Sequence, residues 1–285
     1  VPGAGDSVYF PGAGGKTFIN NQVEVEWLNI LNAEIVFTNS SAGLKITGKG
    51  IWNNGPIKTS SSSEPSVFEV ASGATLRINR PTLRSIFIQN GARLVNNGKT
   101  VVSAYIENNG LLELTDGAKI VYSSLFSTPT GVLNYGTIRK TDSTGIGQIG
   151  GSETVPFFQN LGGRIEVLEG ELLISCTHFL QGGIYETAPG TKLNFFGGFE
   201  QFLEGELIGN QQGTLEYNST QIIPSPEATL NFGGTGVTFS SADLRNNGIL
   251  TIAENTILRM LSGSTMRENT RLINLGAITV METIA

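Results

Sequence analysis

The stretch "AYIENNGLLELTDGAKIVY", Ala104 to Tyr122, contains the pattern that decides the fold. Leu112 and Leu114 stand two residues apart, which is the period of a β-strand that points one row of side chains inward and the other outward. An Asn-Gly pair, Asn109-Gly110, comes directly before this run. Because Asn-Gly adopts positive φ at little steric cost, the pair predicts a tight corner next to a short strand.

The same unit of alternating strand and corner recurs over nearly the whole chain. Clear copies begin at Leu44 ("LKITGKGIWNNG"), Phe157 ("FFQNLGGRIEVLEGELLIS"), Leu203 ("LEGELIGNQQGTLEY"), Ala242 ("ADLRNNGILTIAENTILRM") and Arg271 ("RLINLGAITVMETI"). Loops of variable length, such as "KTSSSSEPS", stand between copies, as stacked coils tolerate. Only Thr256 to Leu261 carries any hint of a helical period, so helical crossovers between parallel strands are not available.

These patterns predict an all-β fold, a single right-handed parallel β-helix (β-solenoid) with short strands and Asn-Gly corners over residues 1–285, in which 1–20 form an N-terminal cap. With roughly 20 to 25 residues a coil, the chain makes about a dozen coils. At about 4.8 Å a coil, the rod is roughly 55 to 65 Å long. Inward Leu, Ile, Val and Phe form stacks, and Asn side chains at equivalent corners form hydrogen-bonded ladders. Antiparallel hairpins are the alternative, since Asn-Gly is also a hairpin signal.

Composition narrows the function. Charged residues make up 15% of the chain and the net charge is -6, with no cluster of Lys or Arg that could neutralise phosphates, so we expect no nucleic-acid partner. No run approaches 18 apolar residues, so we expect no membrane insertion. The single cysteine, Cys176, excludes an intramolecular disulfide. Because the sequence starts abruptly at Val1, we expect a processed or excised segment.

Several segments resemble a known family. The opening "VPGAGDSVYFPG" is similar to the Val-Pro-x-x-Gly-Asp start of β-solenoid regions in large secreted bacterial surface proteins. The stretch from Gly131 to Tyr217, beginning "GVLNYGTIRKT", resembles their Asn-x-Gly-Thr-Ile-x-Lys repeats. The resemblance implies an adhesion or matrix component, extracellular or at the cell surface, with no catalytic residues. Fungal wall adhesins are a more distant likeness, and the lack of cysteines counts against them.

A parallel β-helix is also the fold of polysaccharide lyases and hydrolases, so acid–base candidates need weighing. Glu166, Glu169 and Glu171 fall close together, as do Glu204 and Glu206. Two carboxylates beside a groove serve glycoside hydrolysis as acid and base. We expect these positions instead to face solvent, since they lie beside inward apolar residues such as Ile165 and Leu207.

The sequence gives equally little support for a metal site or a catalytic nucleophile. The four aspartates, Asp6, Asp116, Asp142 and Asp243, lie far apart in the sequence, whereas calcium needs clustered carboxylates. His178, the only histidine, stands two residues from Cys176. A Cys-His nucleophile needs a third group to orient the base, and none is identifiable. We expect a small buried Cys176 and an exposed His178 at a corner.

Several aromatic residues are candidates for contact with sugars. Exposed aromatic side chains stack on sugar rings, and Trp27, Trp52, Tyr105, Tyr122 and Phe195 are candidates, although we expect most of them in the core. Asn39-Ser40-Ser41 and Asn218-Ser219-Thr220 match the glycosylation sequon.

The sequence as a whole predicts a non-catalytic extracellular structural or adhesive rod. It binds a polysaccharide or other surface polymer, or like chains through its ends. We expect no catalytic, cofactor-binding or metal-binding residues. The alternatives are a carbohydrate-active β-helix and, less favoured because regular Thr-x-Thr rows are absent, an ice- or mineral-binding face.

Overall fold

The chain is a parallel β-solenoid. The structure, a computed structural model, describes residues 5–10, 16–38, 42–53, 55–59, 67–79, 81–115, 117–122, 131–142, 145–151, 157–197, 200–245, 248–267 and 269–281. These residues include no helix, and every strand pairing among them is parallel. The predicted solenoid is therefore confirmed, and antiparallel hairpins are wrong for this part of the chain.

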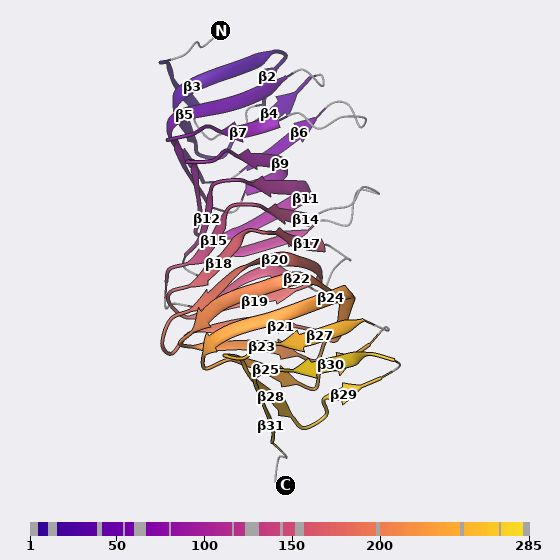
Figure 1. The fold of residues 1–285 in the computed structure, drawn as a ribbon. Coiled ribbons are helices and arrows are strands. Elements are labelled where there is room, and N and C mark those ends of the chain that lie inside the picture. Colours follow the sequence, from indigo (N-terminus) through magenta and orange to yellow (C-terminus); the bar gives the residue numbers. More distant parts are fainter. Residues whose placement is uncertain are drawn as a thin grey trace.

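The strands stack on three faces, which the chain visits in the order 1, 2, 3 in each turn (Figure 1). Several long strands bend across the corner from one face to the next, so that each contributes to two faces. Face 1 holds β1 (Ser7–Phe10), the second halves of β3 (Gln22–Ile30) and β5 (Gly43–Trp52), β8 (Thr75–Ile78), β10 (Arg93–Asn96), β12 (Leu111–Leu114), β15 (Thr137–Lys140), β18 (Arg164–Val167), the second halves of β20 (Thr177–Thr187), β22 (Glu200–Gln211) and β24 (Gln221–Gly234), β27 (Ile249–Ile252) and β30 (Arg271–Asn274).

Faces 2 and 3 are built in the same way. Face 2 holds β2 (Lys16–Ile19), β4 (Glu34–Phe37), β6 (Gly55–Thr59), the first halves of β9 (Pro81–Ile88) and β11 (Lys99–Asn108), β13 (Lys119–Tyr122), β16 (Ile146–Gly150), β19 (Glu171–Ser175), β21 (Lys192–Phe196), β23 (Thr214–Asn218), β25 (Val237–Ser240), β28 (Ile257–Leu261) and β31 (Ala277–Met281). Face 3 holds the remaining halves of the bent strands with β7 (Val67–Val70), β14 (Gly131–Asn134), β17 (Phe157–Leu161), β26 (Asp243–Leu244) and β29 (Thr265–Met266).

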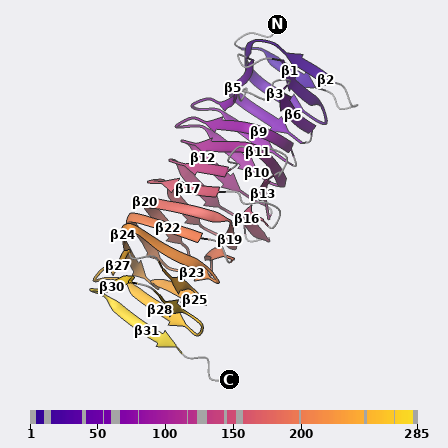
Figure 2. The same ribbon diagram turned by 90° about the vertical axis from the view of Figure 1, so that its right-hand side faces the viewer.

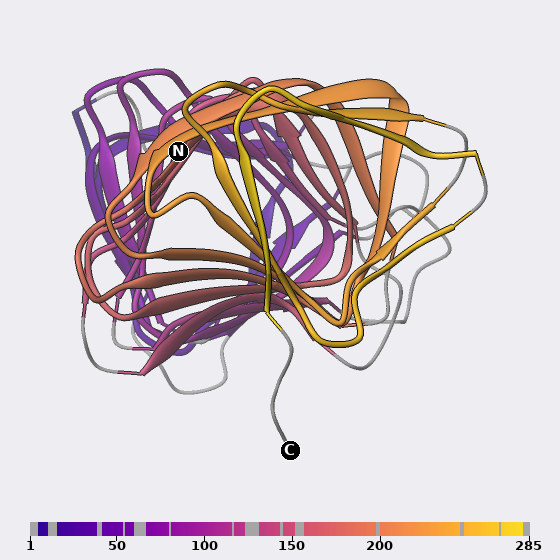
Figure 3. The ribbon, with the colours of Figure 1, turned by 60° about the horizontal axis from the view of Figure 1, so that its bottom comes forward.

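The stack has at least 10 turns, and β1 and β31 lie at its opposite ends (Figure 2). Partners on successive turns are separated by as few as 18 residues, between Arg93 and Leu111, and as many as 29, between Lys119 and Gln148. This range brackets the predicted coil length. Viewed more nearly along the axis, the outlines of the turns overlie one another (Figure 3).

The core lies inside the stack, where period-two alternation sends every second side chain. On face 1, one inward row contains Leu76, Leu94, Leu112, Ile138 and Ile165, which occupy equivalent positions on successive turns and are all buried. In the C-terminal half of the chain, the core contains stacked aromatic side chains. The rings of Phe195 and Tyr217 stack with centroids 4.9 Å apart.

Two segments differ in part from the structure that the sequence predicted. Thr256 to Leu261, the segment with a hint of helical period, is mostly the strand β28, because Leu258 takes an inward position in register with Val237. The expected cap at 1–20 contributes β1 and β2 to the stack, and its residues 1–4 and 11–15 lie outside the described residues.

The corner glycines are needed for a reason that the sequence did not reveal. Gly55 and Gly91 have the expected positive φ, 112° and 79°. Gly110 and Gly248 do not, so the prediction for these Asn-Gly pairs is wrong. A Cβ at Gly110 would lie 2.4 Å from the carbonyl oxygen of Gln89, and one at Gly248 would lie 2.2 Å from that of Pro224. Glycine is required there because the preceding turn approaches so closely.

Candidate functional site

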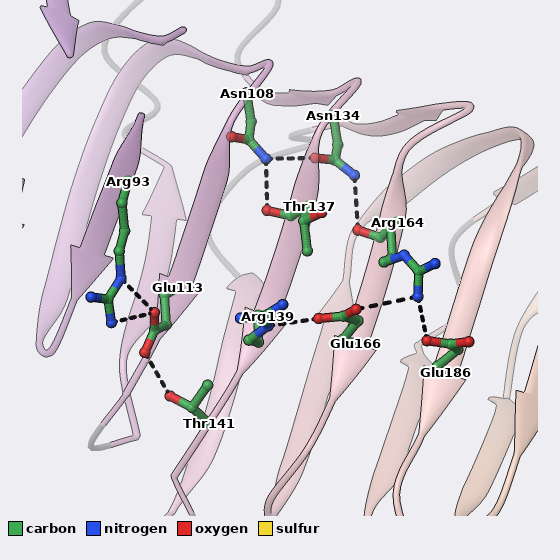
Figure 4. Close-up of polar contacts among 10 residues, drawn as sticks. All are labelled: Arg93, Asn108, Glu113, Asn134, Thr137, Arg139, Thr141, Arg164, Glu166 and Glu186. Atoms are coloured by element: carbon green, nitrogen blue, oxygen red, sulfur yellow. Dashed lines mark hydrogen bonds and ion pairs between the residues drawn. The ribbon is translucent and has the colours of Figure 1, made fainter. Parts of the chain in front are cut away.

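A buried ladder of asparagine side chains holds one corner of the stack together, as the sequence predicted. Asn108 Nδ2 donates to Asn134 Oδ1 at 2.7 Å, and Asn134 Nδ2 donates to Asn160 Oδ1 at 2.7 Å (Figure 4 shows the first two residues). Asn160 Nδ2 continues the chain to the hydroxyl of Tyr185 at 2.8 Å. The three amides are fully buried. The ladder fixes the backbone of the corner between faces 3 and 1.

A row of alternating charges runs along the outside of face 1 beside this corner (Figure 4). Arg139 Nε donates to Glu166 Oε2 at 2.6 Å, and Arg164 Nη1 contacts Glu166 Oε1 at 3.3 Å. Arg164 Nη1 also contacts Glu186. Both oxygens of Glu166 are thus bound to guanidinium groups, and its side chain is only 12% exposed.

The charged row begins with a second ion pair on the preceding turns. Arg93 contacts Glu113 Oε2 through Nε at 2.9 Å and through Nη2 at 2.7 Å. The hydroxyl of Thr141 donates to the other oxygen, Oε1, at 3.0 Å. We name the group formed by Arg93, Glu113, Arg139, Arg164, Glu166 and Glu186 the charged ladder. Its three cations and three anions balance each other.

The glutamates weighed as acid–base candidates do not converge on one cleft. Glu166 belongs to face 1, whereas Glu171 begins β19 on face 2 and accepts a hydrogen bond from Asn194 Nδ2 at 3.1 Å. Glu169 lies exposed in the intervening turn. Glu204 and Glu206 are exposed and accept hydrogen bonds from Gln181 and Asn231 at 2.8 and 2.7 Å.

Cys176 and His178 are both fully buried, so the prediction of an exposed His178 is wrong. His178 occupies an inward row in register with Phe158 and Gln201. The hydrogen-bond partner of its Nδ1 is the backbone oxygen of Cys176, at 2.7 Å, and not the sulfur. The alternation of Cys176, His178 and Leu180, all of one parity, is the signal that would have placed the histidine inside.

Burial sets the protonation of both groups. It raises the pKa of the Cys176 thiol, and it lowers the pKa of His178 to about 4 although hydrogen bonds oppose the shift. At neutral pH the pair is therefore a neutral thiol and a neutral imidazole. A cysteine nucleophile needs the thiolate, which this environment disfavours.

The aspartates are dispersed as expected. Asp6, Asp142 and Asp243 lie on different turns, and Asp116 lies outside the described residues. Partial burial raises the pKa of Asp243, but hydrogen bonds from Thr265 and Arg245 and the charges of Arg245 and Arg267 outweigh it and hold the pKa below its usual value. Within the described ranges, no group of three or more His, Cys, Asp or Glu side chains is arranged to hold a metal ion.

The corner between faces 3 and 1 carries an open trough of about 840 Å³ on its outer side. We call it the corner trough. It crosses five successive strands of face 1, from β8 to β18, and the charged ladder forms part of one wall. Its lining residues are Gly73, Ala74, Thr75, Asn90, Gly91, Ala92, Arg93, Asn109, Gly110, Leu111, Tyr135, Gly136, Thr137, Gly162, Gly163 and Arg164.

The aromatic residue at this trough was missed from the sequence. Tyr135 is 48% exposed and lines the trough, next to Asn134 of the ladder. Tyr135 stands between Asn134 and Gly136, at a corner where most residues are small. This unusual position is the signal in the sequence that could have identified Tyr135 as a surface residue. Of the aromatic candidates, Trp52 and Phe195 are buried, Trp27 is 37% exposed, Tyr105 is half-buried, and the side chain of Tyr122 lies outside the described residues.

One glycosylation sequon is also visible. Asn218 is half-buried at the end of β23, and its Oδ1 accepts a hydrogen bond from the Ser219 hydroxyl at 3.0 Å. The sequon at Asn39 lies outside the described residues.

Comparison with known proteins adds no assignment. The chain matches no protein-family model, no curated protein and no solved structure. In the part of the chain that the structure describes, no helix is long and apolar enough to cross a membrane. The class that the fold defines is the parallel β-solenoid, and any function must be argued from its surface.

Proposed function

We propose that this chain is a non-catalytic, extracellular structural or adhesive rod that binds a polymer along its length. The observation that carries the proposal is the corner trough, which repeats one kind of surface over five turns. At about 4.8 Å a turn, the trough extends for roughly 19 Å. A ligand that contacts every one of these turns must be extended, which favours a polymer over a compact small molecule.

The state of the glutamates supports a binding role over catalysis. In glycoside hydrolysis, one carboxyl group donates a proton while the other acts as base or nucleophile, and both face the same bond. Glu166 has both oxygens held by arginines, and Glu171 lies on another face. The extracellular location draws on the resemblance to secreted surface proteins and on the low share of charged residues, 15% of the chain.

The test is to incubate the full chain with a panel of soluble polysaccharides and to measure binding and cleavage on the same samples. Affinity electrophoresis gives binding, and release of reducing ends or unsaturated products gives turnover. We expect retardation by at least one polysaccharide and no product. Product that accumulates linearly with time, and that Glu166→Gln or Glu171→Gln abolishes, would establish the carbohydrate-active alternative instead.

The last described turn favours a second candidate, end-to-end association of like chains. Among the described strands, β29, β30 and β31 each pair on one side only. Leu275, Val280 and Met281 on this turn are 59%, 71% and 51% exposed. Unpaired strand edges with apolar side chains are templates for association. Negative-stain microscopy with light scattering distinguishes filaments, which this candidate requires, from dispersed rods.

A further inference from the structure

The floor of the corner trough is kept free of side chains by the fold itself. A Cβ at Gly136 would lie 2.3 Å from the carbonyl oxygen of Gly110, and one at Gly163 would lie 2.4 Å from Nδ2 of Asn134. Contacts this short are relieved only by separating adjacent turns or by breaking the asparagine ladder. At these two positions the close packing of adjacent turns therefore leaves no room for a side chain on the floor of the trough.

Small residues at a corner do not by themselves make a binding site. A second trough lined by corner glycines can be compared with the corner trough. It has a volume of about 620 Å³, lies on the corner between faces 1 and 2, and has Gly190, Gly213 and Gly236 among its lining. None of the described residues that line it is aromatic. Tyr135 thus distinguishes the corner trough from a trough that the packing of turns produces by itself.

The side chain of Tyr135 has no described hydrogen bond and stands about half in solvent. An exposed aromatic ring offers a large apolar face with few rotatable bonds, and the C–H face of a sugar ring is its natural complement. Arg93 and Arg164, whose side chains are 42% and 36% exposed, line the same trough.

These arginines retain donors for a ligand. Arg93 uses Nε and Nη2 on Glu113, and Arg164 uses Nη1 on Glu166 and Glu186. A guanidinium carries five N–H groups in a planar fork, so each arginine keeps N–H groups that are not used in these contacts. Hydroxyl groups on a polymer chain would accept hydrogen bonds from them.

The charges decide which polymer is favoured. Three arginines and three glutamates of the charged ladder balance each other, and the whole chain has a net charge of -6. The charged residues that line the trough, Arg93 and Arg164, are both paired with glutamates of the charged ladder. A polyanion would compete with these glutamates for the two arginines, and it would be repelled at long range by the chain as a whole. A neutral polymer avoids that repulsion.

We propose that the corner trough binds a neutral polysaccharide that lies parallel to the solenoid axis, with one sugar ring stacked on Tyr135 and hydroxyl groups bonded to Arg93 and Arg164. This inference rests on the proposed function, since it names the polymer class and the place where it binds.

The experiment measures affinity by titration calorimetry with neutral glycans (a mixed-linkage glucan, a galactomannan and a dextran) and acidic ones (polygalacturonate and alginate). The variants are Tyr135→Ala, Tyr135→Phe and, as a matched control, Tyr9→Ala. Tyr9 is 54% exposed on β1 and does not line the corner trough. Far-UV circular dichroism and the thermal midpoint verify that each variant keeps the fold.

We expect a neutral glycan to bind, Tyr135→Ala to weaken it by about tenfold, and Tyr135→Phe and Tyr9→Ala to bind nearly as the unmodified chain does. Unchanged affinity in Tyr135→Ala would overturn the inference while leaving polymer binding intact. Binding of acidic glycans alone, with affinity that falls steeply as salt rises, would overturn the neutral class. Failure of every glycan to bind would overturn both the inference and the proposed function.

Discussion

The asparagine ladder leads to the sharpest prediction about stability, which concerns the variant Asn134→Leu. Asn134 is the middle member of the ladder. It accepts from Asn108 and donates both to Asn160 and to the backbone oxygen of Arg164, at 3.3 Å in the last case. Leucine fits this row sterically, because the equivalent position two turns later is the buried Leu180.

The cost follows from what the substitution leaves behind. Three hydrogen bonds at about 1 kcal/mol each are lost, and Oδ1 of the buried Asn160 is left without the donor that served it, which costs about 1 to 3 kcal/mol more, so the total is roughly 4 to 6 kcal/mol. Replacing Asn108, Asn134 and Asn160 together by leucine leaves no orphaned amide and adds apolar burial. We therefore expect the triple variant to be no less stable than the single one.

The assay is urea unfolding followed by far-UV circular dichroism for the single and triple variants. Because the turns of a solenoid contact mainly their neighbours, unfolding is not always cooperative over the whole chain. Hydrogen exchange of amides in residues 105–167 supplies the local unfolding free energy. A triple variant that is less stable than Asn134→Leu would refute the reasoning, since it would mean that the lost bonds matter more than the orphaned group.

Three further predictions concern burial, packing and charge. His178 has a pKa of about 4 when folded and 6.5 as its ordinary value. Its contribution to the free energy of unfolding is therefore fully present above pH 6.5 and falls by about 3 kcal/mol as the pH drops to 4. Urea unfolding across this range should lose this pH dependence in His178→Phe, and identical pH profiles for the variant and the unmodified chain would contradict the prediction. Gly136→Ala, whose Cβ would meet backbone at 2.3 Å, should lower the thermal midpoint more than Gly190→Ala, which has φ 75° but open space; the reverse order would show that backbone strain outweighs the contact. Glu166→Gln should cost about 1 kcal/mol at low salt and less in 1 M NaCl, so a cost independent of salt would argue against the charged ladder.

The sequence predicted the fold well because alternation acts locally. Leu112 and Leu114 face inward for the same reason that Ile165 and Val167 do, and no knowledge of partners is needed. The asparagine ladder was also foreseeable, since equivalent corners of stacked turns bring like residues together. The hint of helix at Thr256 to Leu261 was misleading because a short apolar run fits either period.

The corner trough could not be predicted, because it depends on which turns align. The number of residues between partners on successive turns varies from 18 to 29 with the loops, so the register of Arg139 with Glu166 is not evident from spacing. The role of Gly110 was hidden for the same reason: the clash that requires glycine is with Gln89 of the preceding turn.

The position of the ladder within its row bears on why buried amides occur here at all. The same row contains Val70 and Ile88 before Asn108, and Leu180 and Leu203 after Asn160. The fold therefore tolerates apolar residues at this corner, and an apolar ladder would remove the cost of burying amides. Apolar side chains, however, pack against each other in almost any order of turns. A buried amide needs a polar partner on the neighbouring turn, which here is another amide or, for Asn160, the hydroxyl of Tyr185. A turn that stacks out of order therefore leaves a buried polar group unpaired and is penalised. The ladder ends where Asn108 Oδ1 faces Ile88 with no described hydrogen bond, which is the penalty at one boundary of the row. On this argument the three asparagines specify the alignment of the turns that form the corner trough.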